Sequence, residues 1–563
     1  DLELSLLRRP LCEARAWLQE TNLWWEAQEQ DTRAFLSLTK ALMVAADVAG
    51  SALPRRGLDI EAWVRAALRS VCSDTMFTEV LANRLKGAKP RPFQAQMANS
   101  PSRVTFVAAG CGTGKTAGAY AWARKWAQGR KLFFCYPTTG TASEGFAGYA
   151  VGVDGLEAAL VHSRAAVDLD EILDNGRDED YLAAHIARVF GLESWQAHVT
   201  VCTVDAVLGL MQNNRRGLFS SAAIVNGAFV FDEIHQYDAA LFDMLVEFLT
   251  TLRGLPVLLM TASLPAHRLE RLQAALQSLG EGLCIVQGPA DLEAIPRYEL
   301  TPASLETAIE EAKAVVNADG RVLWVCNTVD RCREVGRVLR GKPVLPYHAR
   351  YRYLDRVARH RAVMDAFEVE PSQAAVAVTT QVCEVSLDIS ADLLVTDLAP
   401  IAALIQRLGR LNRRVTAEQP GMPKKSLIIQ PPIAAPYGQD ELDAASGWLE
   451  QLPQRALSQS DLVSGLVSAA ASEVERQMVP SEWLSGGPYS APGQLREPGF
   501  TLPVVRTEDL PDRADAKTVV ENTIPMLLGS VADELFGWPR QNGAFVAPAG
   551  RITYSPLWGA SWA

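Results

Sequence analysis

The fold is decided by one stretch, Phe106-Val107-Ala108-Ala109-Gly110-Cys111-Gly112-Thr113-Gly114-Lys115-Thr116. An apolar run typical of a strand leads into a glycine-rich turn, and a helical pattern opens at Lys115-Thr116. This is the pattern of a phosphate-binding loop, in which backbone N–H groups converge on phosphate oxygens. The start of the following helix adds a field that favours anions. The stretch therefore predicts a nucleotide site on an α/β fold.

The residue types of this loop assign roles. Lys115 can reach the β- and γ-phosphates of ATP, and the hydroxyl of Thr116 can hold Mg²⁺. Upstream, the amide of Gln94 offers both a donor and an acceptor and suits the edge of an adenine ring. The predicted cofactor-binding residues are Gln94, Gly110, Gly112, Thr113, Gly114, Lys115 and Thr116.

A second motif is the strand-like run Ala228-Phe229-Val230-Phe231, which ends in Asp232-Glu233-Ile234-His235. We expect Asp232 to bind Mg²⁺ through water and Glu233 to orient or deprotonate the attacking water. Acid pairs are common at strand ends. An Asp-Glu-x-His tip after a phosphate loop in the same chain is far more specific.

A third motif is Gln406-Arg407-Leu408-Gly409-Arg410-Leu411-Asn412-Arg413. On a helix, Gln406, Arg410 and Arg413 recur at spacings of three and four and would share one face. Two guanidinium groups on one face suit the charge of a transferring γ-phosphate. The predicted catalytic residues are thus Lys115, Asp232, Glu233, Arg410 and Arg413.

Composition bounds the class of protein. The 563 residues are 48% hydrophobic, which predicts about three to four domains. No apolar run approaches the roughly 18 residues that span a bilayer, so no membrane partner is expected. The nine cysteines are scattered without a Cys-x-x-Cys pair, which argues against a zinc site and a disulfide scaffold.

Charge is unevenly distributed along the chain. The net charge of −11 taken alone counts against nucleic-acid binding, yet residues 321–361 hold eleven Lys/Arg and only three Asp/Glu. Within them, Tyr347-His348-Ala349-Arg350-Tyr351-Arg352-Tyr353 mixes arginine with aromatic residues. That composition fits either a surface that tracks a nucleic-acid strand or a solvated basic helix face.

Strands and helices alternate after the loop, which predicts parallel sheets flanked by helices. Strands are expected near residues 131–136, 199–205, 257–263, 321–328, 375–380 and 393–397, and a solvated helix pair in the acidic insertion 154–195. We predict an α/β chain of two tandem RecA-like domains. Their expected limits are a helical segment at 1–88, domains at 89–292 and 293–430, and a linker with a C-terminal accessory domain at 431–563.

Over about residues 89–430 the motifs resemble those of superfamily 2 helicases, in which Ala109 is the usual first residue of the loop. Three stretches narrow the resemblance to the helicase–nuclease family of type I CRISPR interference, the Cas-three family. They are Thr141-Ala142-Ser143-Glu144-Gly145, Asp232-Glu233-Ile234-His235-Gln236-Tyr237-Asp238 and Thr380-Gln381-Val382-Cys383-Glu384-Val385-Ser386-Leu387-Asp388.

The resemblance implies an enzyme that uses ATP and Mg²⁺ to pull single-stranded DNA in the 3′ to 5′ direction. It implies recruitment by an RNA-guided surveillance complex carrying crRNA and target DNA, in the cytoplasm of a prokaryotic cell. It adds Asp388 and Gln406 to the nucleotide site. The nucleic-acid contacts that it implies are Thr138, Thr203, Thr328, Arg350 and Thr380.

The sequence departs from this family in its nuclease part. The family carries a His-Asp nuclease domain with two metals, whereas this chain has no His before His162 and no His-Asp pair. Ala46-Asp47-Val48-Ala49-Gly50-Ser51 resembles the last acidic motif of that domain. If this resemblance holds, Asp47 is a remnant metal ligand of the nuclease domain. If it does not hold, Asp47 is a helix cap or a surface residue. A divalent transition metal is expected only with a complete nuclease domain.

Two alternatives stay open. One is an RNA helicase of the same superfamily, and the other is an adaptor that binds ATP as a switch without hydrolysing it. Both would use the same phosphate loop, so the loop does not separate them.

Overall fold

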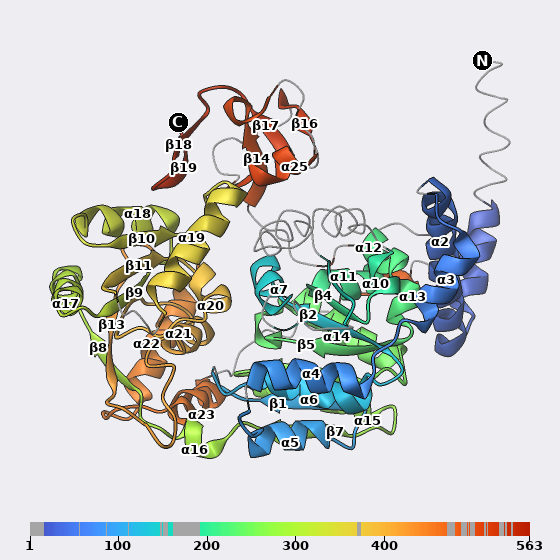
Figure 1. The fold of residues 1–563 in the computed structure, drawn as a ribbon, viewed down its shortest axis with the longest axis horizontal. Helices are drawn as coiled ribbons and strands as arrows, with labels where there is room; N and C mark the ends of the chain where they lie inside the picture. The colour runs from blue at the N-terminus through green and yellow to red at the C-terminus, as the bar shows by residue number, and fades with distance from the viewer. Residues whose placement is uncertain are drawn as a thin grey trace.

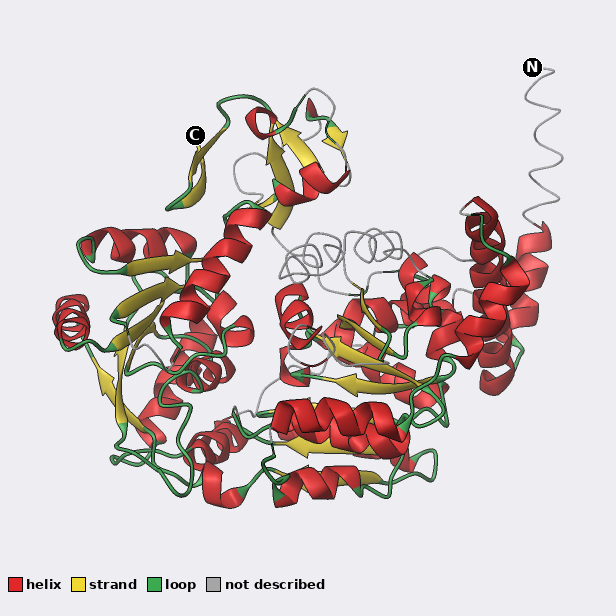
Figure 2. Ribbon diagram, viewed as in Figure 1, coloured by secondary structure: helices red, strands yellow, loops and turns green. Residues whose placement is uncertain are grey.

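Two parallel β-sheets lie side by side and make up most of the computed structural model (Figures 1 and 2). Lobe 1 comprises residues 92–287 and lobe 2 residues 298–429. The structure describes residues 16–563 except 56, 86, 111, 147–148, 150–155, 162–191, 369–372, 470–478, 486–492, 494, 496–500, 512–513, 515, 528–533, 535–536 and 542–543.

The sheet of lobe 1 has seven described strands in the order β3-β4-β2-β5-β6-β1-β7, all parallel. Strands β1, β2, β4, β5 and β6 are mostly apolar runs covered on both faces, as buried parallel sheets require, whereas edge strand β7 is partly exposed. They are β1 (Val104–Ala108), β2 (Lys131–Tyr136), β3 (Ala158–Val161), β4 (Val199–Thr203), β5 (Gly227–Phe231), β6 (Val257–Thr261) and β7 (Leu283–Gln287).

The sheet of lobe 2 has six described strands in the order β10-β11-β9-β12-β13-β8, again all parallel. Parallel neighbours bring all carboxyl ends of one sheet to the same edge, where the loops that carry chemistry gather. The strands are β8 (Tyr298–Pro302), β9 (Arg321–Val325), β10 (Val344–Tyr347), β11 (Ala375–Thr379), β12 (Leu393–Asp397) and β13 (Lys424–Ile429).

Helices cover the faces of both sheets (Figure 2). Those of lobe 1 include α5 (Pro92–Ala98), α6 (Lys115–Trp126), α7 (Thr139–Gly145), α10 (Glu193–Gln196), α11 (Val204–Leu208), α12 (Arg215–Phe219), α13 (Ser221–Ile224), α14 (Ala239–Thr251) and α15 (Ala266–Gln277). Those of lobe 2 include α17 (Leu305–Asn317), α18 (Val329–Val338), α19 (Tyr353–Ala366), α20 (Val382–Ser386) and α21 (Ile401–Leu408). The short α16 (Ala290–Glu293) lies in the crossover between the lobes.

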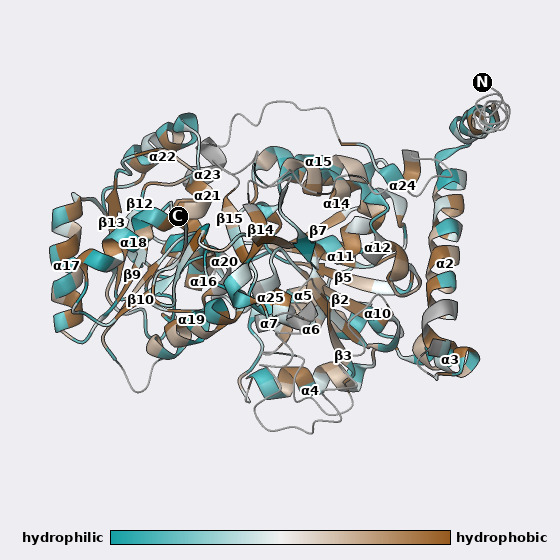
Figure 3. Ribbon diagram, turned by 90° about the horizontal axis from the view of Figure 1, so that it is seen from above, coloured by the Kyte–Doolittle hydropathy of each residue, from teal (hydrophilic) through white to brown (hydrophobic). Residues whose placement is uncertain are grey.

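The N-terminal segment is helical, as predicted. A helix over 16–26 precedes α2 (Gln30–Arg55) and α3 (Ile60–Arg69), while α4 (Asp74–Leu85) packs into the core of lobe 1. Helix α2 stands alongside lobe 1 and carries both apolar and polar turns (Figure 3). Phe35 and Met43 on it are 67% and 68% exposed, so part of its apolar surface is uncovered in this chain.

The C-terminal segment ties the two lobes together. Helices α22 (Gln439–Gln451) and α23 (Gln459–Ala469) follow lobe 2, and the chain then returns to lobe 1 at α24 (Glu482–Ser485). There, the carbonyls of Trp483 and Leu484 accept hydrogen bonds from Ser37 Oγ at 2.8 Å and Trp25 Nε1 at 3.0 Å. Residues 479–485 therefore strap the N-terminal helices to lobe 1.

The last residues form a small β domain that docks on lobe 2. Its four-stranded sheet has the order β15-β14-β17-β16, and a separate hairpin β18-β19 follows. The Ala560 N–H donates to the Arg350 carbonyl at 2.7 Å, and the Tyr351 hydroxyl donates to the Leu557 carbonyl at 2.6 Å. The bounds are β14 (Thr501–Arg506), α25 (Ala516–Glu521), β15 (Ile524–Leu527), β16 (Arg540–Gln541), β17 (Ala544–Ala547), β18 (Ile552–Ser555) and β19 (Gly559–Trp562).

This docking corrects one prediction. The aromatic residues Tyr347, Tyr351 and Tyr353 are at most 5% exposed, because the C-terminal hairpin and the core of lobe 2 cover them. The prediction of an exposed stacking surface at residues 347–353 is therefore wrong, and so is the alternative prediction of a solvated helix face. The aromatic composition reflects an internal interface.

Two further predictions of local structure are wrong. In the acidic insertion, residues 158–161 form edge strand β3 instead of a helix, and residues 162–191 lie outside the described part. The helix expected over 405–414 ends at Leu408, because Gly409 caps it and Asn412 adopts a left-handed φ of 50°. The domain boundaries themselves stay predictions.

Among the described residues, no helix combines the length and hydropathy that a bilayer crossing requires. Location in the cytoplasm remains a prediction.

We predict that Trp483→Ala lowers the melting midpoint of lobe 1. The indole is fully buried where residues 479–485 meet α2 and lobe 1, and truncating a buried Trp costs about 3–5 kcal/mol. Trp24→Ala is the matched control, since that side chain is 53% exposed. Differential scanning calorimetry should show a clear downward shift for Trp483→Ala alone, and equal shifts would contradict the buried strap.

Candidate active site at the lobe interface

The phosphate loop follows β1 and opens α6, as the sequence indicates. Gly112 and Gly114 have φ values of 77° and 92°, a left-handed conformation that favours glycine. The Thr113 hydroxyl donates to the Gly110 carbonyl at 2.8 Å and closes the turn. Cys111 lies outside the described residues. The loop thus has the backbone shape that a cradle for phosphate needs.

Lys115 is buried at the centre of this loop. Its Nζ donates to the Ala109 carbonyl at 2.8 Å and lies 3.8 Å from Glu233 Oε1. The ammonium group therefore already stands between the loop and the acidic tip of β5, where it can meet the phosphates of a nucleotide.

Asp232 and Glu233 form an unequal pair. Burial first, and then the charge of Glu233, raise the pKa of Asp232 to about 7. Burial also acts to raise the pKa of Glu233. The positive charges of Lys115, Arg410 and Arg413 outweigh this effect, so the pKa of Glu233 is lowered. Glu233 is thus ionised at neutral pH and can accept a proton or hydrogen bond from water.

The backbone at Glu233 is strained. Its φ of 48° is left-handed, which is uncommon for a residue with a side chain, and it places the carboxylate at the start of a short 3₁₀ helix (Ile234–Gln236). Such strain clusters at functional positions because surrounding contacts must hold it. The geometry therefore supports a chemical role for Glu233.

The donor set fits a hard divalent cation. The Thr116 hydroxyl and the Asp232 carboxylate are oxygen ligands, and Mg²⁺ takes its remaining ligands from phosphate and water. The raised pKa of Asp232 marks a buried carboxylate that a cation would stabilise. When bound, such an ion supplies charge neutralisation at the phosphates.

Lobe 2 reaches this site through Gln406. Its Nε2 lies 3.1 Å from His235 Nε2, and His235 Nδ1 lies 3.0 Å from Thr261 Oγ1. The Thr261 hydroxyl donates to the Ser263 carbonyl at 2.6 Å, so it accepts from His235 Nδ1–H. His235 Nε2 is then the acceptor for Gln406, which requires a neutral imidazole. Burial lowers the pKa of His235 and favours that form.

Arg410 and Arg413 follow α21 in a loop, not on a helix face. Arg413 lies against the phosphate loop, since a β-carbon at Gly112 would be 3.4 Å from Arg413 Cγ, and its Nε pairs with Asp388 at 2.8 Å. Arg410 donates to the carbonyls of Cys383 and Glu384 at 3.1 and 2.7 Å. Arg413 is the guanidinium beside the phosphate loop, while Arg410 holds α20 in this structure.

Arg407 was not among the predicted site residues. Its guanidinium is fully buried and bonds Glu384 Oε1 at 2.8 Å, Asn327 Oδ1 at 3.1 Å and Thr396 Oγ1 at 2.9 Å. These partners come from the ends of three elements, so Arg407 fixes the platform that carries Gln406. Only its position inside the third motif hinted at this role.

Gln94 lies beside the loop. It is 5% exposed, its Nε2 donates to the Gly114 carbonyl at 2.9 Å, and its Oε1 accepts from the Arg91 N–H at 2.8 Å. The Arg91 guanidinium donates to the Thr113 carbonyl. Arg91, which the sequence did not single out, thus shares with Gln94 the task of holding the loop.

The predicted nucleic-acid contacts follow carboxyl ends of parallel strands. Thr138 follows β2, Thr203 ends β4, and Thr328 and Thr380 follow β9 and β11. Thr138 is exposed, whereas Thr203 and Thr380 are buried. Arg350 pairs with Asp330 at 3.0 Å, and its side chain is 14% exposed. A cavity of about 740 Å³ spans the cleft and is lined by Thr138, His235, Gln381 and Gln406 among others.

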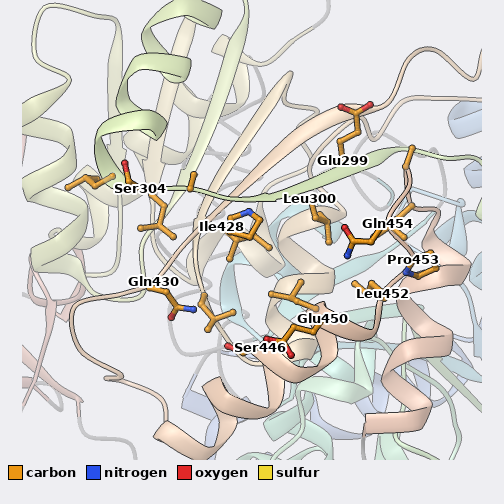
Figure 4. Close-up of a pocket in the computed structure, with 18 of the residues that line it drawn as sticks. Glu299, Leu300, Ser304, Ile428, Gln430, Ser446, Glu450, Leu452, Pro453 and Gln454 are labelled. Atoms are coloured by element: carbon orange, nitrogen blue, oxygen red, sulfur yellow. The ribbon is translucent and has the colours of Figure 1, made fainter.

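Two features stand apart from this site. A cavity of about 1020 Å³ lies at the outer edge of lobe 2 between β8, β13 and α22, and contains none of the predicted site residues (Figure 4). Asp47 is exposed in the middle of α2, so it is not a helix cap. Within the described residues no group of three His, Cys, Asp or Glu is placed to hold a metal.

Comparison with known proteins now gives the family. Residues 318–416 match the family described as CRISPR-associated nuclease/helicase Cas3, C-terminal. A Myxococcus xanthus protein named putative CRISPR-associated nuclease/helicase Cas3 is 42% identical over all of this chain and 75% of its own length. The chain belongs to the Cas3 family. It spans 51% of a Methanocaldococcus jannaschii relative of the same name, at 29% identity.

Solved Cas3 structures share the fold. T. fusca Cas3 with AMPPNP superposes with a TM-score of 0.68 at 19% identity, over 89% of this chain and 74% of that one. A chain of a CRISPR RNA-guided surveillance complex, pre-nicking, gives 0.57 at 17% identity, over 85% and 71%. The predictions of the family, of two tandem RecA-like domains and of a helicase-type ATPase are confirmed. The roles of individual residues stay predictions.

We predict that the Mg²⁺-dependent part of ATP affinity in this Cas3 chain falls below about pH 7. The cation needs the ionised Asp232, whose pKa is about 7, so protons compete with it by about tenfold per pH unit below that value. Titration of a fluorescent ATP analogue with Mg²⁺ and with EDTA checks this. In Asp232→Asn, the Mg²⁺-dependent affinity for ATP should no longer change with pH below pH 7. An equal dependence of affinity on pH in EDTA would contradict the prediction.

Proposed function

We propose that this chain hydrolyses ATP to move along single-stranded DNA in the 3′ to 5′ direction and so unwinds target DNA in type I CRISPR interference. The observation that carries the proposal is the cleft itself. Gln406 of lobe 2 contacts His235 of lobe 1, and Arg413 lies against the phosphate loop. A nucleotide between these groups would touch both lobes, so its hydrolysis can change their separation.

The chain's own residues divide the work of hydrolysis. The loop and Lys115 hold the phosphates, Asp232 and Thr116 hold the cation, and Glu233 orients water. Arg413 stabilises the charge of the transferring phosphoryl group, a role typically worth ~10³–10⁵ in rate. Arg410, predicted for the same role, supports it by holding α20 through the Cys383 and Glu384 carbonyls. Asp388 positions Arg413 through their 2.8 Å ion pair. The groups needed for phosphoryl transfer are thus provided by both lobes.

Strand binding is proposed at the ends of β2, β4, β9 and β11. Thr138 and Thr328 cap α7 and α18, so backbone N–H groups at both helix starts lie near hydroxyls. Phosphates of a strand suit such positions. Lobe movement would then shift one set of contacts against the other along the strand.

Recruitment and degradation complete the proposal. The Cas3 name of the relatives and the fold shared with the surveillance-complex chain support a partnership with an RNA-guided complex carrying crRNA and target DNA. Asp47 is proposed as one ligand of a His-Asp nuclease site, whose other ligands would have to come from outside the described residues.

Lys115→Ala should abolish ATP hydrolysis, because no other described group can replace the ammonium between the loop and Glu233. In the parent chain, single-stranded DNA should raise the turnover number and duplexes with a 3′ overhang should be unwound. Stimulation by RNA instead of DNA would assign the RNA-helicase alternative. A single slow turnover with intact Mg²⁺ binding would assign the switch adaptor.

His235→Ala and Gln406→Ala should each reduce DNA stimulation of the ATPase by about tenfold, and the double variant should be no worse than either single one. The reason is their mutual contact, which lets lobe 2 sense the acidic tip. Gln277→Ala, on the exposed end of α15, is the matched control. Additive losses measured in the same steady-state assay would show that the two residues act separately.

A further inference from the structure

Glu293 lies where the chain crosses from lobe 1 to lobe 2. It ends the short helix α16, which lies next to α23 (Figure 1). Its Oε1 accepts a hydrogen bond from the Gly110 N–H at 2.7 Å. A side chain of the crossover therefore holds the second residue of the phosphate loop, and no motif in the sequence indicated this contact.

Gly288 makes room for the carboxylate, and Gly110 makes room for the neighbouring Gln459. A β-carbon at Gly288 would lie 2.1 Å from Glu293 Oε1 and 2.9 Å from Ala109 Cβ, which no real contact permits. A β-carbon at Gly110 would lie 2.8 Å from Cγ of Gln459. Neither glycine has a left-handed φ, so space and not backbone conformation requires them. The pocket around Glu293 is closely built.

The same place is fixed to lobe 2. The Tyr298 hydroxyl, at the first residue of β8, donates to Gln459 Oε1 at 3.0 Å. The Tyr298 backbone also pairs with Leu457, at 3.1 and 2.8 Å. On the other side, the Gly288 N–H donates to the Ala108 carbonyl at 2.8 Å, one residue before the loop begins. The crossover thus bonds to the phosphate loop and its strand at one end, and at the other end Arg297 and Tyr298 both bond Leu457 before α23.

Charges around Glu293 suit this role. Burial raises the pKa of its carboxyl, and the Gly110 N–H, the Lys115 ammonium and the Arg297 guanidinium oppose the rise. Lys115 itself bonds the Ala109 and Gly110 carbonyls at 2.8 and 3.4 Å. The peptide between Ala109 and Gly110 is therefore held from its carbonyl side by Lys115 and from its N–H side by Glu293.

We propose that Glu293 is a positioning residue of the ATP site, which fixes the first turn of the phosphate loop from the crossover and makes the loop's position depend on that of lobe 2. The inference rests on the proposed ATPase function. It acts on nucleotide binding, since the contact involves the loop backbone and neither the metal ligands nor the attacking water. A loop that loses the contact holds ground state and transition state less well by the same amount.

The test is steady-state ATP hydrolysis by the full chain with single-stranded DNA. Glu293→Ala should raise KM for ATP by about tenfold and change kcat by less than about threefold, as expected for one lost charge-assisted hydrogen bond. Glu293→Gln keeps an acceptor oxygen and should recover most of the loss. Asp291→Ala, an exposed acid on the same helix, is the matched control.

Gly288→Ala supplies a second route to the same loss, because its methyl group would displace the carboxylate. Because the same methyl group would also meet Ala109 Cβ at 2.9 Å, Gly288→Ala should raise KM at least as much as Glu293→Ala does. An unchanged KM in Glu293→Ala, or equal losses in the Ala and Gln variants, would overturn the inference. Lys115→Ala distinguishes failure of this inference from failure of the proposed ATPase function. If Lys115→Ala is inactive while Glu293→Ala equals the parent, only the positioning role fails. If Lys115→Ala is fully active, the proposed function fails.

Discussion

The contact between Gln406 and His235 is the interaction on which the function of this architecture depends. Each lobe has its own parallel sheet and its own core, so neither needs the other to bury its strands. At the cleft a chain of polar groups runs between them, from Gln406 through the imidazole to Thr261. Because the imidazole is buried, it stays neutral, and one nitrogen can accept while the other donates. The acidic tip of lobe 1 is thereby coupled to the arginine-bearing loop of lobe 2.

The rest of the chain limits how these lobes can move. Residues 479–485 fasten the C-terminal segment to lobe 1, while hairpin β18-β19 fastens it to lobe 2. Helices α22 and α23 pack on lobe 2, and Gln459 extends from them to the phosphate loop. The segment after residue 430 showed no catalytic pattern in the sequence, yet its described residues bond both lobes.

The sequence predicted the elements whose residues must meet phosphate. Lys115 starts α6, Asp232 follows β5 and Gln406 lies on helix α21, as expected, because the chemistry of phosphoryl transfer restricts both residue type and place. Burial also made β2 and β9 predictable, since their apolar runs have no other stable position. The failures have equally physical reasons. Tyr351 and Tyr353 look like stacking residues until the C-terminal hairpin covers them, and this long-range packing leaves no local trace.

The end of α21 at Leu408 changes how the arginines work. On a continuous helix Arg410 and Arg413 would point the same way and move as one body. In the loop, the Arg410 guanidinium donates hydrogen bonds to the carbonyls of α20. Arg413 instead pairs with Asp388, whose side chain is 64% exposed. The Arg413 side chain is only 18% exposed, but the Asp388 carboxylate faces solvent, so the guanidinium can exchange this partner for a phosphate. Arg413 can therefore leave Asp388 for the nucleotide at low cost, while Arg410 keeps the loop in place, and the division follows from a helix that stops two residues before the first arginine.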